Sequence, residues 1–487
     1  MKRTFGIPLA ARAVLFAWAA FAFAQAATGA EPPDANKSAQ PAAPVARLGG
    51  KTAGETQGHS AGTVFYIAFR DEGRELVSAG SDGQLLLWNV ADGNCRPLLD
   101  ANSGQGRWFA VSSDGRLALS LPPESRDVLR VWDIRKAAVV RELAVKGFLA
   151  SAAFSFDGQF LATADGTTSI SLWDVPSGRL LARLKSGEVM CGNIDLGLAV
   201  SPDGKMVAAG RFGAEIHEVA AGFSDEPAAK LPKGMAGRPR AFSPDGRRLA
   251  VFTGKLIVYD LATGAIAAVT PGRPYVRAAA FSPDGRRIAL ASDDDSITIW
   301  DVSPPPEQAP AADAGEKKLE ELWDDLSGGA PAAYEASQAL FIEGPRAVAL
   351  LRERVKPLAA PRPADPARVL ADLDSNDFRV REEASRKLAA FGDVKFLQDE
   401  LAKAASAEVR VRIEEILGEL TSPLPRTAEE LRASRAVRVL ELMGNGPARE
   451  LLSRLAAGGP GRLTRDADAA LARLKPLTGL PASAPAP

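Results

Sequence analysis

The chain has 487 residues, with 59 basic and 60 acidic side chains and a formal net charge of −1. That balance excludes the general attraction to nucleic acid or to anionic membranes that a strongly basic chain would have. Hydrophobic residues make up 46%, which is ordinary for a globular protein. The two cysteines, Cys95 and Cys191, are too few for a disulfide scaffold. We therefore expect a fold that depends on an apolar core, and no nucleic-acid partner.

The first residues have the pattern of a secretory signal. Lys2 and Arg3 make a basic start, the run 13–24 is apolar, and small residues near its end offer cleavage sites. The run is shorter than the roughly 20 apolar residues that span a bilayer, and no later segment is long and apolar enough to do so. We predict a cleaved signal over 1–26, a disordered linker over 27–43, and an exported protein, periplasmic or extracellular. Retention of the signal as an anchor is the alternative.

Six repeats follow the linker. Each has an apolar strand, a polar turn that ends in glycine, a second apolar strand, a short turn and a third strand. Glycine and aspartate tolerate the backbone of a tight hairpin turn, and the alternating apolar residues on either side are typical of half-buried strands. The turns are Asp71-Glu72-Gly73, Ser113-Asp114-Gly115, Phe156-Asp157-Gly158, Pro202-Asp203-Gly204, Pro244-Asp245-Gly246 and Pro283-Asp284-Gly285.

The ends of the third strands give the period of the repeats. They are Trp88-Asn89, Trp132-Asp133, Trp173-Asp174, His217-Glu218, Tyr259-Asp260 and Trp300-Asp301, and successive ends lie 41 to 44 residues apart. A period of about 40 to 45 residues with four strands per unit is typical of β-propeller blades. One blade cannot bury both faces of its sheet, so the blades must stack around an axis. We predict a propeller of six blades over 44–303; a seventh, degenerate blade is the alternative.

The strand ends LWN, VWD, LWD and IWD and the second strands LVSAG, LALS and LATAD resemble the WD-repeat family. This resemblance implies a hydrogen-bonded tetrad of His59, Ser78, Asp82 and Trp88 that ties blade 1 together. The other five blades lack the histidine, and blades 4 and 5 also lack the tryptophan. We therefore expect their stability to depend on apolar stacking more than on tetrads.

The last repeat lacks an outer strand, because the chain turns to Pro304-Pro305-Pro306 directly after its third strand. The segment 45–48, which precedes blade 1, can supply the missing strand. Members of the WD-repeat family often close their ring in this way, and closure removes exposed sheet edges. We predict that 45–48 completes blade 6.

The period changes to that of helices after a Pro/Ala linker over 304–317. Helices are expected over 316–326, 330–342 and 345–355, and apolar stripes follow in three further stretches. The stripes are Val380, Ala384 and Leu388; Val409, Ile413 and Leu417; and Ala436, Leu440 and Met443, followed by Ala448 and Leu452. Short helices joined by Gly, Pro or Asp turns resemble HEAT-like α-solenoids. We predict a multidomain β plus α protein with a HEAT-like helical domain over 318–475 and a disordered tail over 476–487.

The whole layout, with its LWDDL segment at 322–326, resembles a group of exported bacterial proteins that join a WD-repeat propeller to a helical tail. That resemblance supports a prediction of the domain architecture more than a prediction of function, because the members are mostly known by the names of their domains and not by an activity.

No catalytic constellation stands out in the sequence. His59 is placed in the tetrad, and His217 stands where other blades have Trp or Tyr, so both have structural interpretations. This leaves no histidine for a catalytic triad or a metal site. The cluster 293–295, three aspartates, is interpreted as a solvated turn and not as a calcium site, which needs six or more oxygens. We predict no enzyme activity, no cofactor and no metal. Cys95 and Cys191 lie in blades that are not neighbours, so we expect no disulfide between them.

Three arginines recur at one repeat position. Four residues before the apolar residue that opens each turn, blades 2, 5 and 6 carry Arg107, Arg238 and Arg277. In the WD-repeat family the start of the innermost strand lines the central channel and its rim, where partners usually bind. One hypothesis is that these arginines recognise an acidic peptide or another anion. The alternative is that they are unrelated surface residues.

We therefore predict an exported, monomeric scaffold that binds a protein or peptide partner through the propeller face and the helical tail. Two alternatives remain open at this point. One is a propeller enzyme with a site at the mouth of the channel. The other is a structural protein of the cell envelope without a discrete ligand.

Overall fold

A computed structural model gives the architecture of the chain. The expected signal, both linkers and the C-terminal tail lie outside the residues that it describes. The described residues are 44–49, 59, 64–99, 107–122, 125, 127–145, 149–165, 169–185, 197–210, 214–219, 229–230, 237–270, 275–303, 319–357, 365–404, 406–420 and 427–474.

The described strands form six four-stranded antiparallel sheets, one for each predicted repeat. Blade 1 contains β2 (Val64–Arg70), β3 (Glu75–Gly80), β4 (Leu85–Asn89) and β5 (Cys95–Leu99), with a short 3-10 turn, η1 (Asp71–Gly73), between β2 and β3. Blade 2 contains β6 (Arg107–Val111), β7 (Leu117–Leu121), β8 (Val128–Asp133) and β9 (Ala138–Ala144). Blade 3 contains β10 (Leu149–Phe154), β11 (Phe160–Asp165), β12 (Ser169–Asp174) and β13 (Arg179–Lys185).

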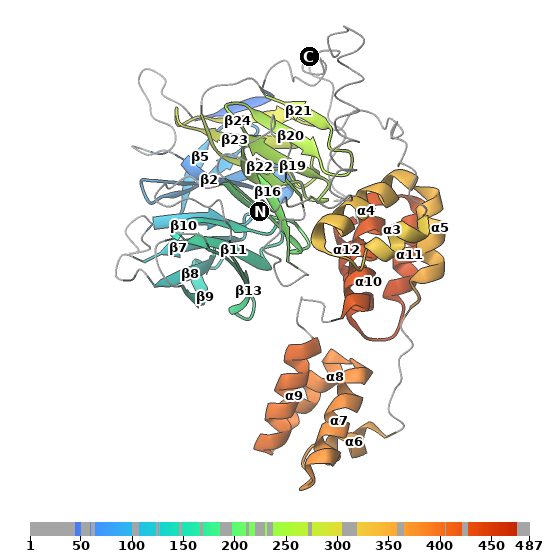
Figure 1. Cartoon of the computed structure of the whole chain (residues 1–487). Helices are drawn as coiled ribbons and strands as arrows, with labels where there is room; N and C mark the ends of the chain where they lie inside the picture. Colours follow the sequence, from blue (N-terminus) through green and yellow to red (C-terminus); the bar gives the residue numbers. More distant parts are fainter. Residues whose placement is uncertain are drawn as a thin grey trace, which may run out of the picture.

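The second half of the ring repeats this order. Blade 4 contains β14 (Gly197–Val200), β15 (Met206–Gly210), β16 (Glu215–Glu218) and β17 (Ala229–Lys230). Blade 5 contains β18 (Arg238–Phe242), β19 (Arg248–Phe252), β20 (Leu256–Asp260) and β21 (Ile266–Val269). Blade 6 contains β22 (Val276–Phe281), β23 (Arg287–Ser292) and β24 (Ile297–Asp301), and a strand from the start of the propeller completes it. The first strand of each blade lies innermost, and β2 contacts both β6 and β22, so six blades close the ring (Figure 1).

The strand that completes blade 6 is β1 (Ala46–Leu48), as the sequence predicts. It pairs antiparallel with β24, with Ala46 opposite Ile299 and Leu48 opposite Ile297. The side chain of Leu48 is buried in the cluster that blades 1 and 6 share. The first and last strands of the propeller therefore belong to one sheet, which removes an open edge from the ring.

The hairpin turn between the first two strands has the same hydrogen bonds in blades 2 to 6. In blade 2, the Ser112 hydroxyl donates to Asp114 Oδ1 at 2.6 Å, and that oxygen also accepts the backbone N–H of Arg116. Gly115 follows with φ +65°, in the left-handed region that favours glycine. The corresponding serines are Ser155, Ser201, Ser243 and Ser282. The turn aspartates thus fold the hairpins, which accounts for their recurrence.

Most of the propeller core lies between blades. One hydrophobic cluster combines Phe69 and Trp88 of blade 1 with Ala280 and Ile297 of blade 6. Similar clusters join blade 3 to blade 4, and blade 5 to blade 6. Each sheet therefore buries its faces against its neighbours, as stacking around an axis requires.

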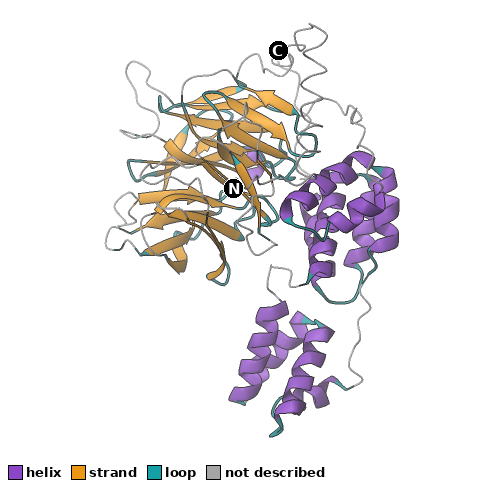
Figure 2. Cartoon of the chain, viewed as in Figure 1, coloured by secondary structure: helices purple, strands orange, loops and turns teal. Residues whose placement is uncertain are grey.

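Ten helices are described after the propeller (Figure 2). They are α3 (Leu319–Asp325), α4 (Ala330–Glu343), α5 (Pro345–Arg354), α6 (Pro366–Asp372), α7 (Phe378–Phe391), α8 (Val394–Lys403), α9 (Ala407–Leu420), α10 (Ala428–Met443), α11 (Gly446–Ala456) and α12 (Arg462–Leu474). The first three confirm the helices that the sequence predicts between 316 and 355, within a few residues at each end. In the described part of the chain, no helix is both long and apolar enough to cross a membrane.

The helices pack in two groups, each with its own core (Figure 1). Helices α3–α5 and α10–α12, which we call the bundle, share one cluster that includes Leu340, Leu351, Leu440 and Leu452. Helices α6–α9, which we call the inserted module, surround a second cluster that includes Leu388 and Ile413. A helical region after the propeller is what the sequence predicts, and the structure adds how it is divided. The three apolar stripes do not continue as one stack, because the first two belong to the module and the third to the bundle.

Candidate functional site

The structure brings the four residues of the expected tetrad together in blade 1. Trp88 Nε1 donates to Ser78 Oγ at 2.7 Å, and Ser78 Oγ lies 2.8 Å from His59 Nε2. His59 Nδ1 lies 2.8 Å from Asp82 Oδ1. A Cβ at Gly80 would lie 2.4 Å from His59 Nδ1, so only glycine leaves room for the imidazole. The arrangement holds β3 and β4 together and leaves no ring nitrogen of His59 for chemistry.

Only part of this network recurs in the other blades. Trp132 donates to Ser120 at 2.8 Å in blade 2, and Trp173 donates to Thr163 at 2.9 Å in blade 3. Trp300 of blade 6 donates instead to Thr298 of its own strand. Blades 4 and 5 have His217 and Tyr259 at this position, and both side chains are buried. Among the described residues, a bond from this tryptophan to a hydroxyl on the neighbouring strand is therefore found in blades 1 to 3.

Of the arginines that the sequence places at one repeat position, Arg107 and Arg238 begin β6 and β18, and Arg277 is the second residue of β22. Arg238 and Arg277 approach the same aromatic ring: their guanidinium carbons lie 5.7 and 5.2 Å from the centroid of Tyr275. Arg277 also lies 5.9 Å from the ring of Phe65 in blade 1. The side chain of Arg107 lies outside the described residues. The structure thus joins two of the three predicted arginines through aromatic residues of blades 6 and 1.

Arg238, Arg277, Tyr275 and Phe65 form a cluster that we call the rim, and neighbouring residues support it. Arg240 donates to the carbonyl of Val276 at 3.2 Å and lies 6.0 Å from the ring of Phe252, which packs edge-on against Tyr275. Asp293 Oδ1 accepts the backbone N–H of Tyr275 at 3.1 Å. Beside the rim, the inner strands enclose a cavity of about 90 Å³, lined by Arg240, Arg277 and aromatic and small apolar residues. Contact with the aromatic rings restricts the positions that these guanidinium groups can take.

The rim and the hairpin turns lie at opposite ends of the inner strands. Arg238 begins β18, and the turn over 243–246 follows the end of the same strand. The same order holds in blade 6, where Arg277 lies near the start of β22 and the turn follows Phe281. We call the end that carries the turns the turn face.

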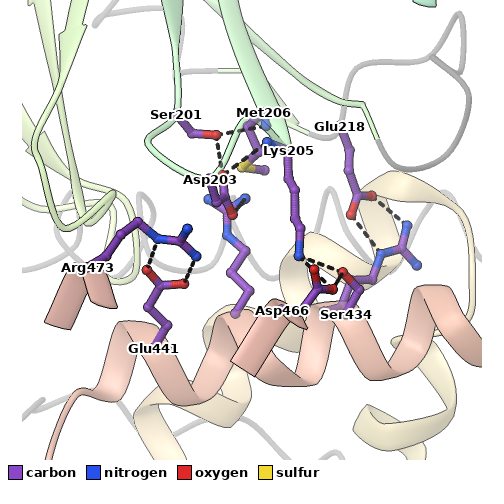
Figure 3. Close-up of polar contacts among 11 residues, drawn as sticks. Ser201, Asp203, Lys205, Met206, Glu218, Ser434, Glu441, Asp466 and Arg473 are labelled. Atoms are coloured by element: carbon purple, nitrogen blue, oxygen red, sulfur yellow. Dashed lines mark hydrogen bonds and ion pairs between the residues drawn. The ribbon is translucent and has the colours of Figure 1, made fainter. Parts of the chain in front are cut away.

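The bundle is attached to the turn face at blade 4 by a buried ion pair (Figure 3). Arg435 of α10 donates from Nε and Nη2 to the two carboxylate oxygens of Glu218 at 2.8 and 2.5 Å. The side chains of Arg435 and Glu218 are 4% and 11% exposed, so the pair is largely removed from water. Arg435 Nη1 also donates to the carbonyls of Leu326 and Gly328, which follow α3. One guanidinium thus connects blade 4 with two helices of the bundle.

A second polar group lies one hairpin away in the same blade (Figure 3). Lys205 donates to the Ser434 hydroxyl at 2.7 Å and to Asp466 of α12 at 3.0 Å. Ser434 in turn donates to Asp466 at 2.7 Å. Because the Lys205 ammonium is paired with a carboxylate, it cannot serve as a base for the serine. Ser434 is therefore a structural bridge between α10 and α12, and not a nucleophile.

The turn aspartate of blade 4 faces the bundle arginines. Asp203 Oδ2 lies 3.7 Å from Arg438 Nη1. Burial acts to raise the pKa of the Asp203 carboxyl, but the charges of Arg438, Lys205 and Arg473 and a hydrogen bond from Ser201 together hold it well below its usual range. Asp203 is therefore ionised in the folded protein, and it attracts α10.

Blade 5 supplies the rest of the interface. Arg247 donates to the carbonyl of Met443 at 3.1 Å and lies 5.3 Å from the ring of Phe341. The carbonyl of Leu261 accepts hydrogen bonds from Tyr334 at 3.2 Å and from Gln338 at 2.5 Å. Tyr334 and Ala330 of α4 also belong to the hydrophobic cluster of blades 4 and 5. The bundle thus contacts blades 4 and 5 through both polar and apolar groups.

A cavity separates part of α12 from blades 3 and 4. This cavity of about 260 Å³ is lined by Asp157, Asp203, Asp466 and by Lys205, Arg465 and Arg473 among others. Opposite charges balance around it, so it favours neither an anion nor a cation. Among the described residues, no group of three His, Cys, Asp or Glu side chains is placed to hold a metal ion. Cys95 is a free thiol whose pKa is raised by burial, and Cys191 lies outside the described residues.

Sequence reasoning found the rim arginines but missed the interface. Arg238 and Arg277 occupy one repeat position, so counting along the repeats locates them. Glu218, in contrast, is a departure from the repeat: most other blades have aspartate there, as at Asp133, where Oδ1 accepts the backbone N–H of Arg135. The longer Glu218 side chain reaches Arg435 instead. The glutamate in place of the usual aspartate was the sequence signal for the interface. It could be interpreted only once Arg435 was known to lie opposite Glu218.

Comparison with known proteins agrees with this fold. The profile of the family described as "WD domain, G-beta repeat" matches residues 50–89, 143–174 and 268–301, which fall in blades 1, 3 and 6. The chain therefore carries WD40 repeats in blades 1, 3 and 6 of its six-bladed propeller, which a helical region follows. Proteins built on such repeats are typically scaffolds for protein interactions.

Individual relatives resemble the repeats over a limited length. The chain is 29% identical over 165 residues to rat "Apoptotic protease-activating factor 1", which covers 32% of this chain and 13% of that protein. It is 30% identical over 156 residues to human "WD repeat-containing protein 36", covering 32% and 16%. Human "Pre-mRNA-processing factor 17" is 24% identical over 140 residues, covering 27% and 23%. The chain thus spans less than a quarter of the length of these relatives.

Proposed function

We propose that this chain is an exported, non-catalytic scaffold that binds an acidic peptide segment of a protein partner at the rim. The observation that carries the proposal is the pair of guanidinium groups, Arg238 and Arg277, that flank one tyrosine ring at the mouth of the channel. A guanidinium held by stacking keeps its N–H donors in a fixed plane, which suits a carboxylate.

The position of the bundle supports the same assignment. The bundle covers the turn face of blades 4 and 5, whereas the rim lies at the other end of their inner strands. A partner can therefore reach the rim while the bundle stays in place. Asp293 stands beside Tyr275 and offsets part of the positive charge. We expect moderate affinity that falls as salt is added, because exposed charges are screened.

Binding can be tested with a fluorescent hexaglutamate peptide and its hexaglutamine counterpart as probes. The triple variant R107A/R238A/R277A is expected to weaken hexaglutamate binding at least roughly tenfold, since a hydrogen bond to a charged group contributes about 1.5–3 kcal/mol. The matched control, R116A/R286A, removes exposed arginines from the turns of blades 2 and 6. Equal binding by the triple variant and the wild type, or equal binding of both peptides, would contradict the proposal.

Export rests on the expected signal over 1–26, which lies outside the described residues. Two features support it: the basic start, and the apolar run that is too short to span a bilayer. Mass spectrometry of the N-terminus of the mature protein tests it. We expect a new terminus near residue 26 in the exported fraction. Recovery of the protein only in the cytosol, with residues 1–26 still attached, would refute export.

A further inference from the structure

Blades 4 and 5 lack an internal bond that blades 1 to 3 possess. In blades 1 to 3 the tryptophan donates to a hydroxyl on the neighbouring strand, at Ser78, Ser120 and Thr163. The strand register places Ala209 and Val251 at the equivalent positions of blades 4 and 5. The Tyr259 hydroxyl of blade 5 is buried, and no hydrogen-bond partner lies among the described residues. These two blades therefore depend on other contacts to hold their strands together.

Blade 4 also has the shortest strands among the described residues. Its strands contain 4, 5, 4 and 2 residues, against 6, 6, 6 and 7 in blade 3. Fewer paired residues mean fewer backbone hydrogen bonds between strands, and so a lower free energy for local opening.

The bundle attaches to these same two blades. Glu218 and Lys205 of blade 4, and Arg247 and Leu261 of blade 5, all contact α4, α10 or α12 or the residues that follow them. These contacts are made by residues at the ends of strands. Lys205 and Arg247 directly precede the second strands of blades 4 and 5, and Glu218 is the last residue of the third strand of blade 4. Apolar contact is added by Ala330 and Tyr334, which join the cluster shared by blades 4 and 5.

We propose that the bundle is an intramolecular clamp that holds blades 4 and 5 together in place of the missing tryptophan bonds. The turn face of these blades is thus an interaction surface whose occupant is this chain's own bundle. Glu218 selects blade 4 for the attachment, because it is the strand-end carboxylate that pairs with a buried arginine of the bundle. This inference does not depend on what binds at the rim.

The double variant E218Q/R247A tests the clamp, because it weakens contacts to both blades and leaves every bundle residue unchanged. Hydrogen exchange followed by mass spectrometry reports each blade separately. We expect exchange in β15, β16, β19 and β20 to become at least tenfold faster, while β3, β4, β11 and β12 keep the wild-type rate. The matched control D301N/R286A changes the equivalent residues of blade 6, and it should leave all blades as they are.

Two results would overturn the clamp: unchanged exchange in blades 4 and 5, or an equal increase in all six blades. If the double variant fails to fold, the single variant R247A still tests the clamp, because it removes one hydrogen bond to a carbonyl and one ring contact and leaves Glu218 unchanged. For R247A we expect faster exchange confined to blade 5, and the wild-type rate throughout would overturn the proposal.

Discussion

A single hydroxyl supports the tetrad of blade 1. Ser78 is fully buried, and its oxygen contacts both the Trp88 indole and the His59 ring. Replacing it by alanine leaves two buried nitrogen atoms without that partner, and each unsatisfied group costs about 1–3 kcal/mol.

We therefore predict that Ser78→Ala lowers the free energy of unfolding by about 2–4 kcal/mol, measured by urea denaturation. Ser177→Ala provides the control, because Ser177 lies in an exposed turn of blade 3. Equal stability of the two variants would mean that the tetrad contributes nothing beyond its packing.

The pH dependence of stability should include a contribution from Asp203. Its carboxyl pKa is lowered in the folded state relative to the ordinary value of 3.8. A group with a depressed folded pKa stabilises the protein above its unfolded pKa, and that stabilisation is lost as the pH falls toward the folded pKa.

We expect Asp203→Asn to be less stable than wild type at pH 7, and the difference to shrink as the pH falls below about 4. Urea unfolding at several pH values between 7 and 3 provides the measurement. Asp114→Asn is the matched control, since the described contacts of Asp114 lie within its own turn. A difference that stays constant with pH would contradict the role assigned to Asp203.

At the level of elements, the closing strand β1 has only three residues, but it contributes a buried side chain to the core that blades 1 and 6 share. Leu48 is 2% exposed and packs among residues of blades 1 and 6, whereas the Arg47 side chain is 61% exposed. Truncating a buried leucine to alanine costs about 2–5 kcal/mol, because it loses apolar burial and leaves a cavity.

Leu48→Ala should therefore destabilise the propeller by about 2–5 kcal/mol and speed proteolysis in blade 6. Arg47→Ala should have little effect on either. The measurement is thermal unfolding combined with limited proteolysis and identification of the cleavage sites. Wild-type stability of Leu48→Ala would show that the ring stays closed without this side chain.

The sequence predicted best those features whose position follows from the repeat pattern. Asp-Gly turns, strand ends and the closing strand could all be located, because a repeat fixes the position of each residue. The division of the helical region could not be predicted. An apolar stripe such as Ala436, Leu440 and Met443 shows which face of a helix is buried, but not that its partners lie about a hundred residues earlier, at Leu340. Likewise, repeat position located Arg238 and Arg277, but their common contact with Tyr275 depends on how two blades meet.

For the whole molecule, the two helical groups differ in how firmly they are attached. The bundle has buried ion pairs with the propeller. The inserted module has its own core, and few contacts with the rest of the chain are described: Arg465 donates to the carbonyl of Leu420, Gly392 lies against Pro460, and Gly418 lies near Arg179 of blade 3. A segment with few outside contacts opens independently of the rest.

We predict that the inserted module unfolds at a lower urea concentration than the bundle and the propeller. Hydrogen exchange measured along a urea series should show early loss of protection in α7 and α9, while α10 and β3 stay protected. Simultaneous loss of protection in all four elements would indicate one cooperative unit instead of two.

The pairing of β1 with β24 also determines when the molecule can be completed. During synthesis the segment 46–48 emerges first, but its partner 297–301 follows only after about 250 further residues, and α10 and α12 come later still. Until β24 is available, β1 has no partner and the ring of blades stays open. Closure of the ring is therefore expected to be a late step in the folding of the propeller, because it needs both ends of the propeller segment.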